Sequence, residues 1–337
     1  MVRTPAAAQR PLSRRGFLGA AAALGAGLTL SGCGGGNAAP PGGVSVLAFQ
    51  PPSLGAFLPA IIMARGIDRD HGLPIRFSFT TPDNYNTEFF AGHHDVGGSA
   101  ALLSEALRTE RQVDVTYLFN LFDYFSAVVT SDPGIRSLTD LPGRRLAAAT
   151  GTTNHAMFEW FARRNGLDLD EVELMNQTPA GLSTMALIGR TDATEIWEPA
   201  YTSLRARKPD IRAIDIGLDN WKSEFGTDVI PYLGLAARGE WAAAHPDEAR
   251  TLFAIYRDAA QYTTTQPADA AAVIAAASPN GKAATLQKLI EDPTRLKLHV
   301  APAASMVRDI AAVFDAGRST GYLTRTPPDS IVYKGLS

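Results

Sequence analysis

Short apolar runs bounded by turn residues recur along this chain from residue 44 onward. Such runs are typical of buried strands. They lie at Val44–Phe49, Ile75–Phe79 and Val113–Phe119 and near Leu146, Val172, Thr194 and Ile211. Several of the segments between them carry apolar residues at helical spacing, as Met157, Trp160 and Phe161 do at i, i+3 and i+4. The two alternating patterns predict an α/β fold.

One stretch of the chain resembles another at a distance. In both Thr81–Asp95 and Thr178–Asp192, a Thr-Pro pair is followed by nine residues, a glycine and, soon after, an aspartate. The Thr-Pro would begin a helix and the glycine would end it. We therefore expect two similar lobes of β-α-β-α-β plan, with a ligand cleft where their strand ends face each other.

The repeat also predicts where the lobes begin and end. We expect residues 44–129 and 237–337 to form lobe I, and residues 130–236 to form lobe II. Two chain crossings, near Ser126–Thr130 and Asp228–Ala236, would make the hinge. Helical segments after residue 237 would complete lobe I.

The first 43 residues have the pattern of an export signal and not of a folded domain. Ser13–Leu18 is a twin-arginine motif, and the apolar Phe17–Leu30 is shorter than the ~20 residues that span a bilayer. Leu30–Cys33 is similar to a bacterial lipobox, with Cys33 as the lipid-carrying residue. Residues 1–33 would then be the signal peptide and residues 34–43 a flexible tether.

Composition excludes several classes of function. The formal net charge is −3, which disfavours nucleic-acid binding, because that calls for a basic face. Cys33 is the only cysteine, so the folded part can hold no disulfide, cysteine zinc site or thiol nucleophile. His93, His94 and Asp95 are adjacent and would point apart, so we expect neither a metal site nor a cofactor.

The turn Thr150–Asn154 is a candidate anion site. It follows the strand near Leu146 and precedes a helix, so its backbone N–H groups and the positive helix end would face the cleft. The alternative is that Thr152 or Thr153 only caps the helix.

These features together resemble the solute-binding proteins of ABC importers, in the nitrate, sulfonate, taurine and thiamine-precursor branch. The segments that carry the resemblance are Arg65–Phe77, Asp140–Thr153, Gly166–Leu174 and Gly189–Tyr201. The resemblance implies a type II periplasmic-binding-protein fold: two similar α/β lobes, a ligand cleft and a two-crossing hinge. It also implies an exported, lipid-anchored monomer on the outer face of the cytoplasmic membrane. That monomer would deliver a small organic molecule to a permease and an ATPase.

The resemblance and the strand ends together give a set of candidate ligand contacts. They are Gln50, Ser53, Ser99, Tyr124, Thr150, Gly151, Thr152, Thr153, Asn154, Trp197 and Glu198. Gln50 and Ser53 are equally explained as turn residues, Tyr124 as core, and Glu198 as a partner of a helix N-terminus. With Glu198 in the cleft, we expect a ligand with an acceptor at one end and a donor at the other, such as an aminosulfonate or a pyrimidine.

Two other functions fit parts of the sequence. Gly97–Ala101 approaches the G-x-S-x-G pattern, with alanine in the last place, so a serine hydrolase would use Ser99 with His299. A sensor that presents ligand to a membrane receptor would share the whole fold. We favour the transport protein, which breaks no bond.

Overall fold

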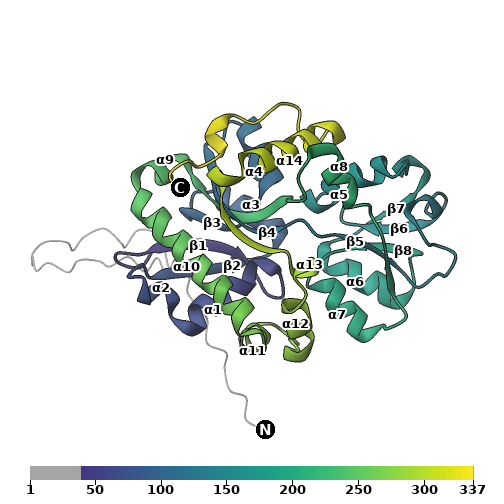
Figure 1. Ribbon diagram of the computed structural model, residues 1–337, viewed down its shortest axis with the longest axis horizontal. Coiled ribbons are helices and arrows are strands. Elements are labelled where there is room, and N and C mark those ends of the chain that lie inside the picture. Colours follow the sequence, from purple (N-terminus) through teal and green to yellow (C-terminus); the bar gives the residue numbers. More distant parts are fainter. Residues whose placement is uncertain (1–38, 337) are drawn as a thin grey trace, which may run out of the picture. The chain divides into compact units, whose positions relative to one another are not determined.

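The computed structural model describes residues 39–336, and they contain two mixed β-sheets. The first sheet has the order β11-β4-β10-β3-β1-β2, and its strands β1 to β4 are labelled in Figure 1. Its strands are β1 (Val44–Phe49), β2 (Ile75–Thr80), β3 (Val96–Ala101), β4 (Val115–Asp123), β10 (Pro231–Arg238) and β11 (Leu298–Pro302). The second has the order β7-β6-β8-β5-β9. Its strands are β5 (Ala127–Thr130), β6 (Arg145–Ala148), β7 (Glu173–Asn176), β8 (Ala193–Ile196) and β9 (Arg212–Ile214). The predicted fold with two α/β lobes is therefore confirmed.

Helices connect and cover the strands. In chain order they begin with α1 (Phe57–Arg65), α2 (Ile67–Asp70), α3 (Pro82–Phe90), α4 (Leu102–Glu110), α5 (Thr153–Arg164), α6 (Pro179–Ile188) and α7 (Ala200–Arg207). Those that follow are α8 (Asp219–Phe225), α9 (Gly239–Ala244), α10 (Pro246–Thr265), α11 (Pro267–Ala277), α12 (Ala283–Ile290), α13 (Pro293–Leu296) and α14 (Val307–Thr320). Within residues 39–336, none of the helices has both the length and the apolar character needed to cross a bilayer.

The internal repeat has a structural basis. In each lobe a Thr-Pro pair starts the second helix: Thr81 accepts a hydrogen bond from the third residue after it to cap α3, and Thr178 caps α6 in the same way. In each lobe a left-handed glycine follows that helix. The parallel strands β2-β1-β3 and β7-β6-β8 also have the same order, with the earliest strand of each group of three in the middle.

The chain passes between the sheets at slightly different places from those predicted. The first passage joins β4 to β5 across Tyr124–Ser126, and the second joins β9 to β10 through α8. The predicted lobe boundaries after residues 129 and 236 each fall inside a strand, β5 and β10. They were placed too late because both passages continue as strands of the sheet that they enter.

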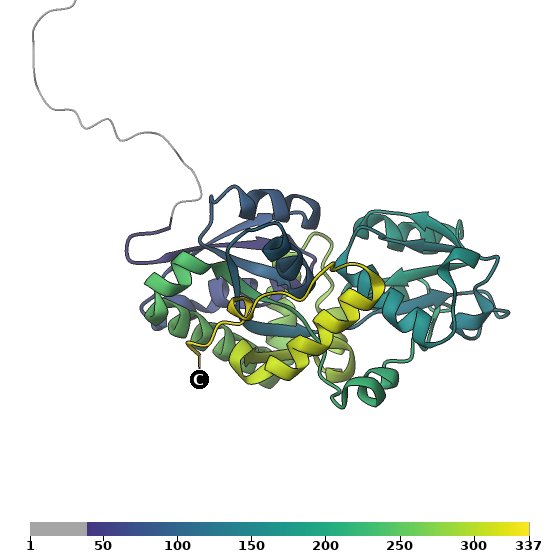
Figure 2. The same ribbon diagram turned by 90° about the horizontal axis from the view of Figure 1, so that it is seen from above.

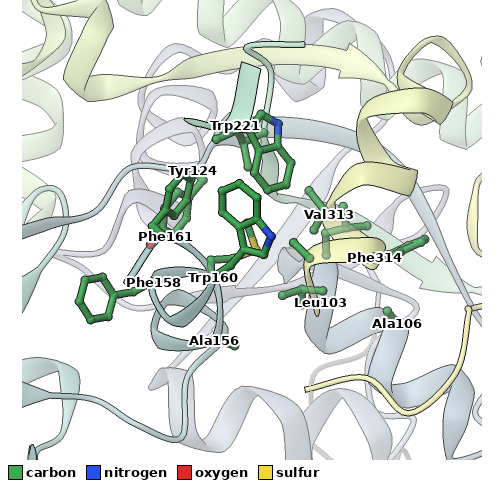
Figure 3. Packing of buried hydrophobic residues seen from close by; sticks show 14 of the residues in the cluster. Leu103, Ala106, Tyr124, Ala156, Phe158, Trp160, Phe161, Trp221, Val313 and Phe314 are labelled. Carbon is green, nitrogen blue, oxygen red and sulfur yellow. The ribbon is translucent and has the colours of Figure 1, made fainter. Parts of the chain in front are cut away.

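The C-terminal segment belongs mainly to lobe I but also contacts lobe II. Helix α10 packs on α1, whereas α14 packs on both α4 and α5 (Figure 2). Figure 3 shows Val313 and Phe314 of α14 in one cluster with Leu103 of α4 and Trp160 of α5. The first and last parts of the chain thus share core with the middle part.

The aromatic residues predicted on α5 form the centre of this cluster. The Trp160 ring lies 5.1 Å from the Trp221 ring, and the Phe161 ring stacks on the Tyr124 ring at 5.7 Å (Figure 3). All four side chains are buried. The helical face that the sequence indicated is therefore the face that anchors α5, and with it the loop before α5.

Candidate functional site

The loop before α5 has free backbone donors, as an anion site requires. Within residues 39–336, no hydrogen-bond partner exists for the backbone N–H of Gly151, Thr153 or Asn154. By contrast, Thr150 N–H donates to Asn176 Oδ1, and Thr152 N–H donates to the Ala149 carbonyl. Gly151 is exposed, and a Cβ there would meet no atom within 4 Å. All three donors lie at the N-terminal end of a 12-residue helix. The helix dipole favours negative charge at this end.

The hydroxyls of Thr152 and Thr153 in this loop already have protein partners. Thr152 is the N-cap of α5: its Oγ1 accepts from His155 N–H at 3.2 Å and donates to the Ala149 carbonyl at 2.8 Å. The Thr153 hydroxyl lies 3.1 Å from the Tyr232 hydroxyl of β10. The capping role considered for Thr152 is therefore present.

Behind the loop lies a buried histidine–glutamate pair that the sequence reasoning missed. His155 Nδ1 lies 2.7 Å from Glu195 Oε2, and both side chains are almost wholly buried. Burial alone would lower the pKa of His155, but the hydrogen bond and charge of Glu195 outweigh it and raise that pKa. Burial raises the pKa of Glu195 despite the neighbouring histidine. His155 follows the loop directly, but nothing in the sequence pairs it with a residue 40 positions away.

Two buried side-chain oxygens here have no hydrogen-bond partner among the described residues. One is the second carboxylate oxygen of the pair, Glu195 Oε1, and the other is Asn154 Oδ1. The Tyr124 hydroxyl donates to the Asn154 carbonyl at 3.2 Å, and the Tyr124 ring is 1% exposed. Tyr124 thus has the core position that the sequence left as one of two alternatives.

On the lobe I side, the predicted residues differ in their exposure to solvent. Gln50 is exposed on the loop after β1. Ser53 caps the short 3-10 helix that follows (Leu54–Ala56), because its Oγ accepts from Gly55 N–H. Ser99 lies in β3 and is fully buried, with its Oγ accepting from Phe49 N–H at 2.8 Å. A Cβ on Gly55 would lie 2.2 Å from Ser99 Oγ, so the loop covers this serine.

This arrangement does not assemble a serine hydrolase. Ser99 lies inside strand β3, and its Oγ accepts a hydrogen bond from the backbone N–H of Phe49. His299 Nδ1 instead lies 2.9 Å from Asp123 Oδ2, and this hydrogen bond raises the pKa of His299. Gly97 is explained by packing, because a Cβ there would lie 2.1 Å from the Tyr85 hydroxyl oxygen.

Trp197 and Glu198 are adjacent in the turn after β8, but they differ in exposure and in partners. Trp197 is half-buried against Ala147, Ala149 and Leu182. The Glu198 carboxylate is inaccessible: it accepts from Thr202 N–H at 3.0 Å and pairs with Arg295 of α13. Burial raises the pKa of Glu198, and Arg295 opposes that effect. Arg295 was not predicted, and it occupies the carboxylate that we expected to meet a ligand.

Two hollows in the surface lie away from these residues. One, of about 340 Å³, is lined by Phe89, Phe90, Gln112, Val113, Asp114, Val115, Arg238 and Glu240. The other, of about 110 Å³, lies in lobe II beside Gly189 and Asp192. Neither is lined by a predicted ligand residue. Among the described residues, no group of three or more His, Cys, Asp or Glu could hold a metal ion.

The fold resembles solved binding proteins over most of its length. The periplasmic aliphatic sulphonate binding protein SsuA from Escherichia coli is 16% identical, with a TM-score of 0.69, over 86% of this chain and 96% of that one. The alkanesulfonate-binding protein SsuA from Xanthomonas axonopodis pv. citri, bound to MOPS, is 17% identical, with a TM-score of 0.68, over 89% and 99%. At these identities the likeness shows the fold.

Sequence comparison identifies the family. A protein of Brucella abortus (strain 2308), named as a binding protein, is 22% identical over 251 residues, which is 70% of this chain and 76% of the relative. The family described as NMT1/THI5 like matches residues 65–270, more than half of the chain. The family membership predicted from the sequence is confirmed by this match. The chain belongs to the NMT1/THI5-like family.

Proposed function

We propose that this protein is the solute-binding component of an ABC importer and that its ligand is a small organic anion of the sulfonate type. The observation that carries the proposal is the set of unpaired N–H groups of Gly151, Thr153 and Asn154 at the start of α5. Backbone donors at a helix N-terminus suit an oxyanion. The two solved structures described above are named for sulfonate binding.

The pairing of Glu198 changes the choice of ligand. An unpaired carboxylate in the cleft would repel a simple anion, and this was our reason to expect a ligand with a donor group. Because Arg295 and Thr202 occupy Glu198, that repulsion is largely neutralised. We therefore favour a sulfonate without requiring an amine, with Gln50 and Trp197 as further contacts on the two lobes.

A matched pair of substitutions at Gly151 tests the site. Gly151→Pro removes one free N–H, whereas Gly151→Ala keeps it and adds a methyl group in open space. Losing one hydrogen bond to a charged ligand should cost about 1.5–3 kcal/mol, or roughly ten- to a hundredfold in affinity. Calorimetry with a series of alkanesulfonates, taurine and nitrate would measure this for both variants.

The proposal predicts that the proline variant loses affinity while the alanine variant binds as the wild type does. Binding should also raise the melting temperature of the wild type, since a ligand at a hundred times its Kd adds about 2.7 kcal/mol. Equal affinities for the two variants, with both shown to be folded, would rule out this loop as the anion site. A screen in which no sulfonate raises the melting temperature would rule out the ligand class.

We further propose that the protein is exported and tethered to the outer face of the cytoplasmic membrane by a lipid on Cys33, where it meets a permease and an ATPase. The signal, Cys33 and the first half of the tether, residues 34–38, lie outside the described residues. The proposal rests on the sequence pattern alone. Cys33→Ser should move the protein from the membrane fraction to the soluble fraction without changing its melting temperature. Retention of the variant in salt-washed membranes would contradict the lipid anchor.

A further inference from the structure

One ion pair connects the two lobes. Arg295, on α13 of the lobe I segment, pairs with Glu198, in the turn between β8 and α7 of lobe II. Every other salt bridge in residues 39–336 joins residues within one lobe or its associated helices. The pair is also well buried, with 20% of the Arg295 side chain and none of the Glu198 side chain exposed.

The arginine makes several contacts to the same turn of lobe II. Its guanidinium donates to Glu198 Oε1 and to Thr202 Oγ1, and it lies over the Tyr201 ring at 4.6 Å from the ring centre. Glu198 accepts in addition from Thr202 N–H at 3.0 Å. The planar guanidinium can make hydrogen bonds and stack on an aromatic ring at the same time, which a lysine cannot do. Arg295 is therefore held by Glu198 and by two residues of the first turn of α7, Tyr201 and Thr202.

Both partners lie close to the first passage of the chain between the lobes. On the Arg295 side, the Lys297 carbonyl accepts from Asp123 N–H at 2.8 Å, at the end of β4. On the Glu198 side, the Tyr201 ring lies 6.3 Å from the Phe125 ring, inside the passage itself. A rotation of one lobe about this passage moves nearby atoms little, because their distance from the axis is short. The contact can therefore persist while the lobes change their angle.

Burial makes the pair costly to separate. An ionised carboxylate that loses its partner in a buried position is strongly unfavourable. Burial already raises the pKa of Glu198, with Arg295 acting against that effect. A motion that kept the pair intact would avoid this penalty, whereas a motion that separated it would not. The hinge should therefore favour rotations about an axis through this contact.

We propose that Arg295 and Glu198 form a hinge brace, an ion pair between the lobes that stays formed as they move and restricts the motion to one axis. Arg295 is then a positioning residue. It holds the Glu198 turn, and hence the neighbouring Trp197, in a fixed relation to lobe I. This proposal concerns the lobe motion and does not depend on which solute binds.

Distances between spin labels on the two lobes test the brace. The described residues contain no cysteine, so in a Cys33→Ser background labels can be placed at Met63→Cys on α1 and Ile188→Cys on α6, both exposed positions. Arg295→Gln should broaden the distance distribution of the ligand-free protein by at least about twofold, because more relative orientations become populated. Glu198→Gln, which keeps the shape of the side chain, should broaden it similarly, and the double variant should add little more.

Two further variants sharpen the test. Arg144→Gln removes a partly exposed pair with Asp132 inside lobe II and should leave the distribution unchanged. Arg295→Lys keeps the charge without the stacking fork and should restore only part of the narrow distribution. If Arg295→Gln and Glu198→Gln both keep the wild-type width and mean, the brace is wrong. If they instead give a narrow distribution at a new distance, the pair is a latch that holds one state, and the brace is equally overturned.

Discussion

Replacing His155 with leucine should destabilise the protein by about 3–4 kcal/mol near pH 7. Leucine is of similar size but donates no hydrogen bond, so it leaves the Glu195 carboxylate without its partner. That side chain is 0% exposed, its Oε2 lies 2.7 Å from His155 Nδ1, and its Oε1 has no partner among the described residues. Removing one member of a buried ion pair costs about 3–5 kcal/mol in general.

Proton uptake limits the penalty in this case. The unpaired Glu195 can become neutral, and forcing this costs about 1.4 kcal/mol for each unit between its ordinary pKa of about 4.3 and the ambient pH. Near pH 7 the limit is therefore about 4 kcal/mol. The penalty should shrink as the pH falls, because a Glu195 already protonated in the unfolded chain loses nothing by being neutral when folded.

The stability of the wild type and that of the leucine variant depend on pH for different reasons, and the sign of each effect is definite. In the wild type the pKa of His155 is raised, so its contribution is complete below the unfolded pKa of about 6.5 and is lost as the pH rises through the folded pKa. In the leucine variant, Glu195 keeps a raised pKa, so its penalty is relieved as the pH falls toward about 4.3. The difference between the two proteins should therefore shrink as the pH falls toward about 4.3, and should shrink again as the pH rises through the raised pKa of His155.

Urea unfolding followed by tryptophan fluorescence at a series of pH values would measure this difference. His155→Gln is a matched control, since it supplies a neutral donor and should recover part of the loss. Glu159→Gln tests the second carboxylate near His155, which is 3.7 Å away and partly exposed, and should have a small effect. A difference below about 1 kcal/mol, or one that does not change with pH, would refute the assignment of a buried, ionised pair.

Three further predictions follow from the packing. Trp221→Ala should lower the free energy of unfolding by about 3–5 kcal/mol in denaturant titrations, because the fully buried ring contacts Trp160 and Phe161; a loss below about 1 kcal/mol would contradict the described core. Gly97→Ala should lower the melting temperature, because its Cβ would lie 2.1 Å from the Tyr85 hydroxyl oxygen; the double variant with Tyr85→Phe should recover part of the loss, and no recovery would exclude this clash. Ser99→Ala should cost about 1–3 kcal/mol of stability, because the buried Phe49 N–H loses its acceptor, and an active-site fluorophosphonate should label neither the variant nor the wild type.

The fold could be predicted from the sequence because its determinants are local. A threonine cap, a proline in the first helical turn and a glycine at the helix end are read within a dozen residues, and they recur in both lobes. The apolar face of α5 was equally visible from residue spacing. The lobe boundaries were harder to predict, because β5 and β10 are apolar strands whose sequences do not indicate which of the two sheets each one joins. Sheet membership depends on pairing with strands that are distant in sequence.

The polar pairs of the candidate site could not be predicted for the same physical reason. Glu198 and Arg295 are 97 residues apart, and no local pattern marks either as the partner of the other. The burial of Ser99 could not be predicted from its Gly-Gly-Ser sequence. It depends on distant neighbours, because Gly97 lies against the buried Tyr85 side chain and Gly98 against Val46 and Tyr256. Loop Thr150–Asn154 was predictable, since a strand, small residues and a helix follow one another directly.

These features give the two lobes different physical roles around the proposed ligand. Lobe II supplies the donors, because α5 begins with free N–H groups and the ion pair beneath it is neutral overall when His155 is protonated. Were His155 neutral, the charge of Glu195 would lie uncompensated behind the loop and oppose the helix dipole. Glu159, Tyr124 and Tyr232 are the other titratable groups near this pair, and burial keeps the pKa of both tyrosines above the usual value. Under the proposed function, the His155–Glu195 pair would determine whether the positive end of α5 can act on an anion, whereas the Arg295–Glu198 pair would restrict the axis about which the two lobes rotate.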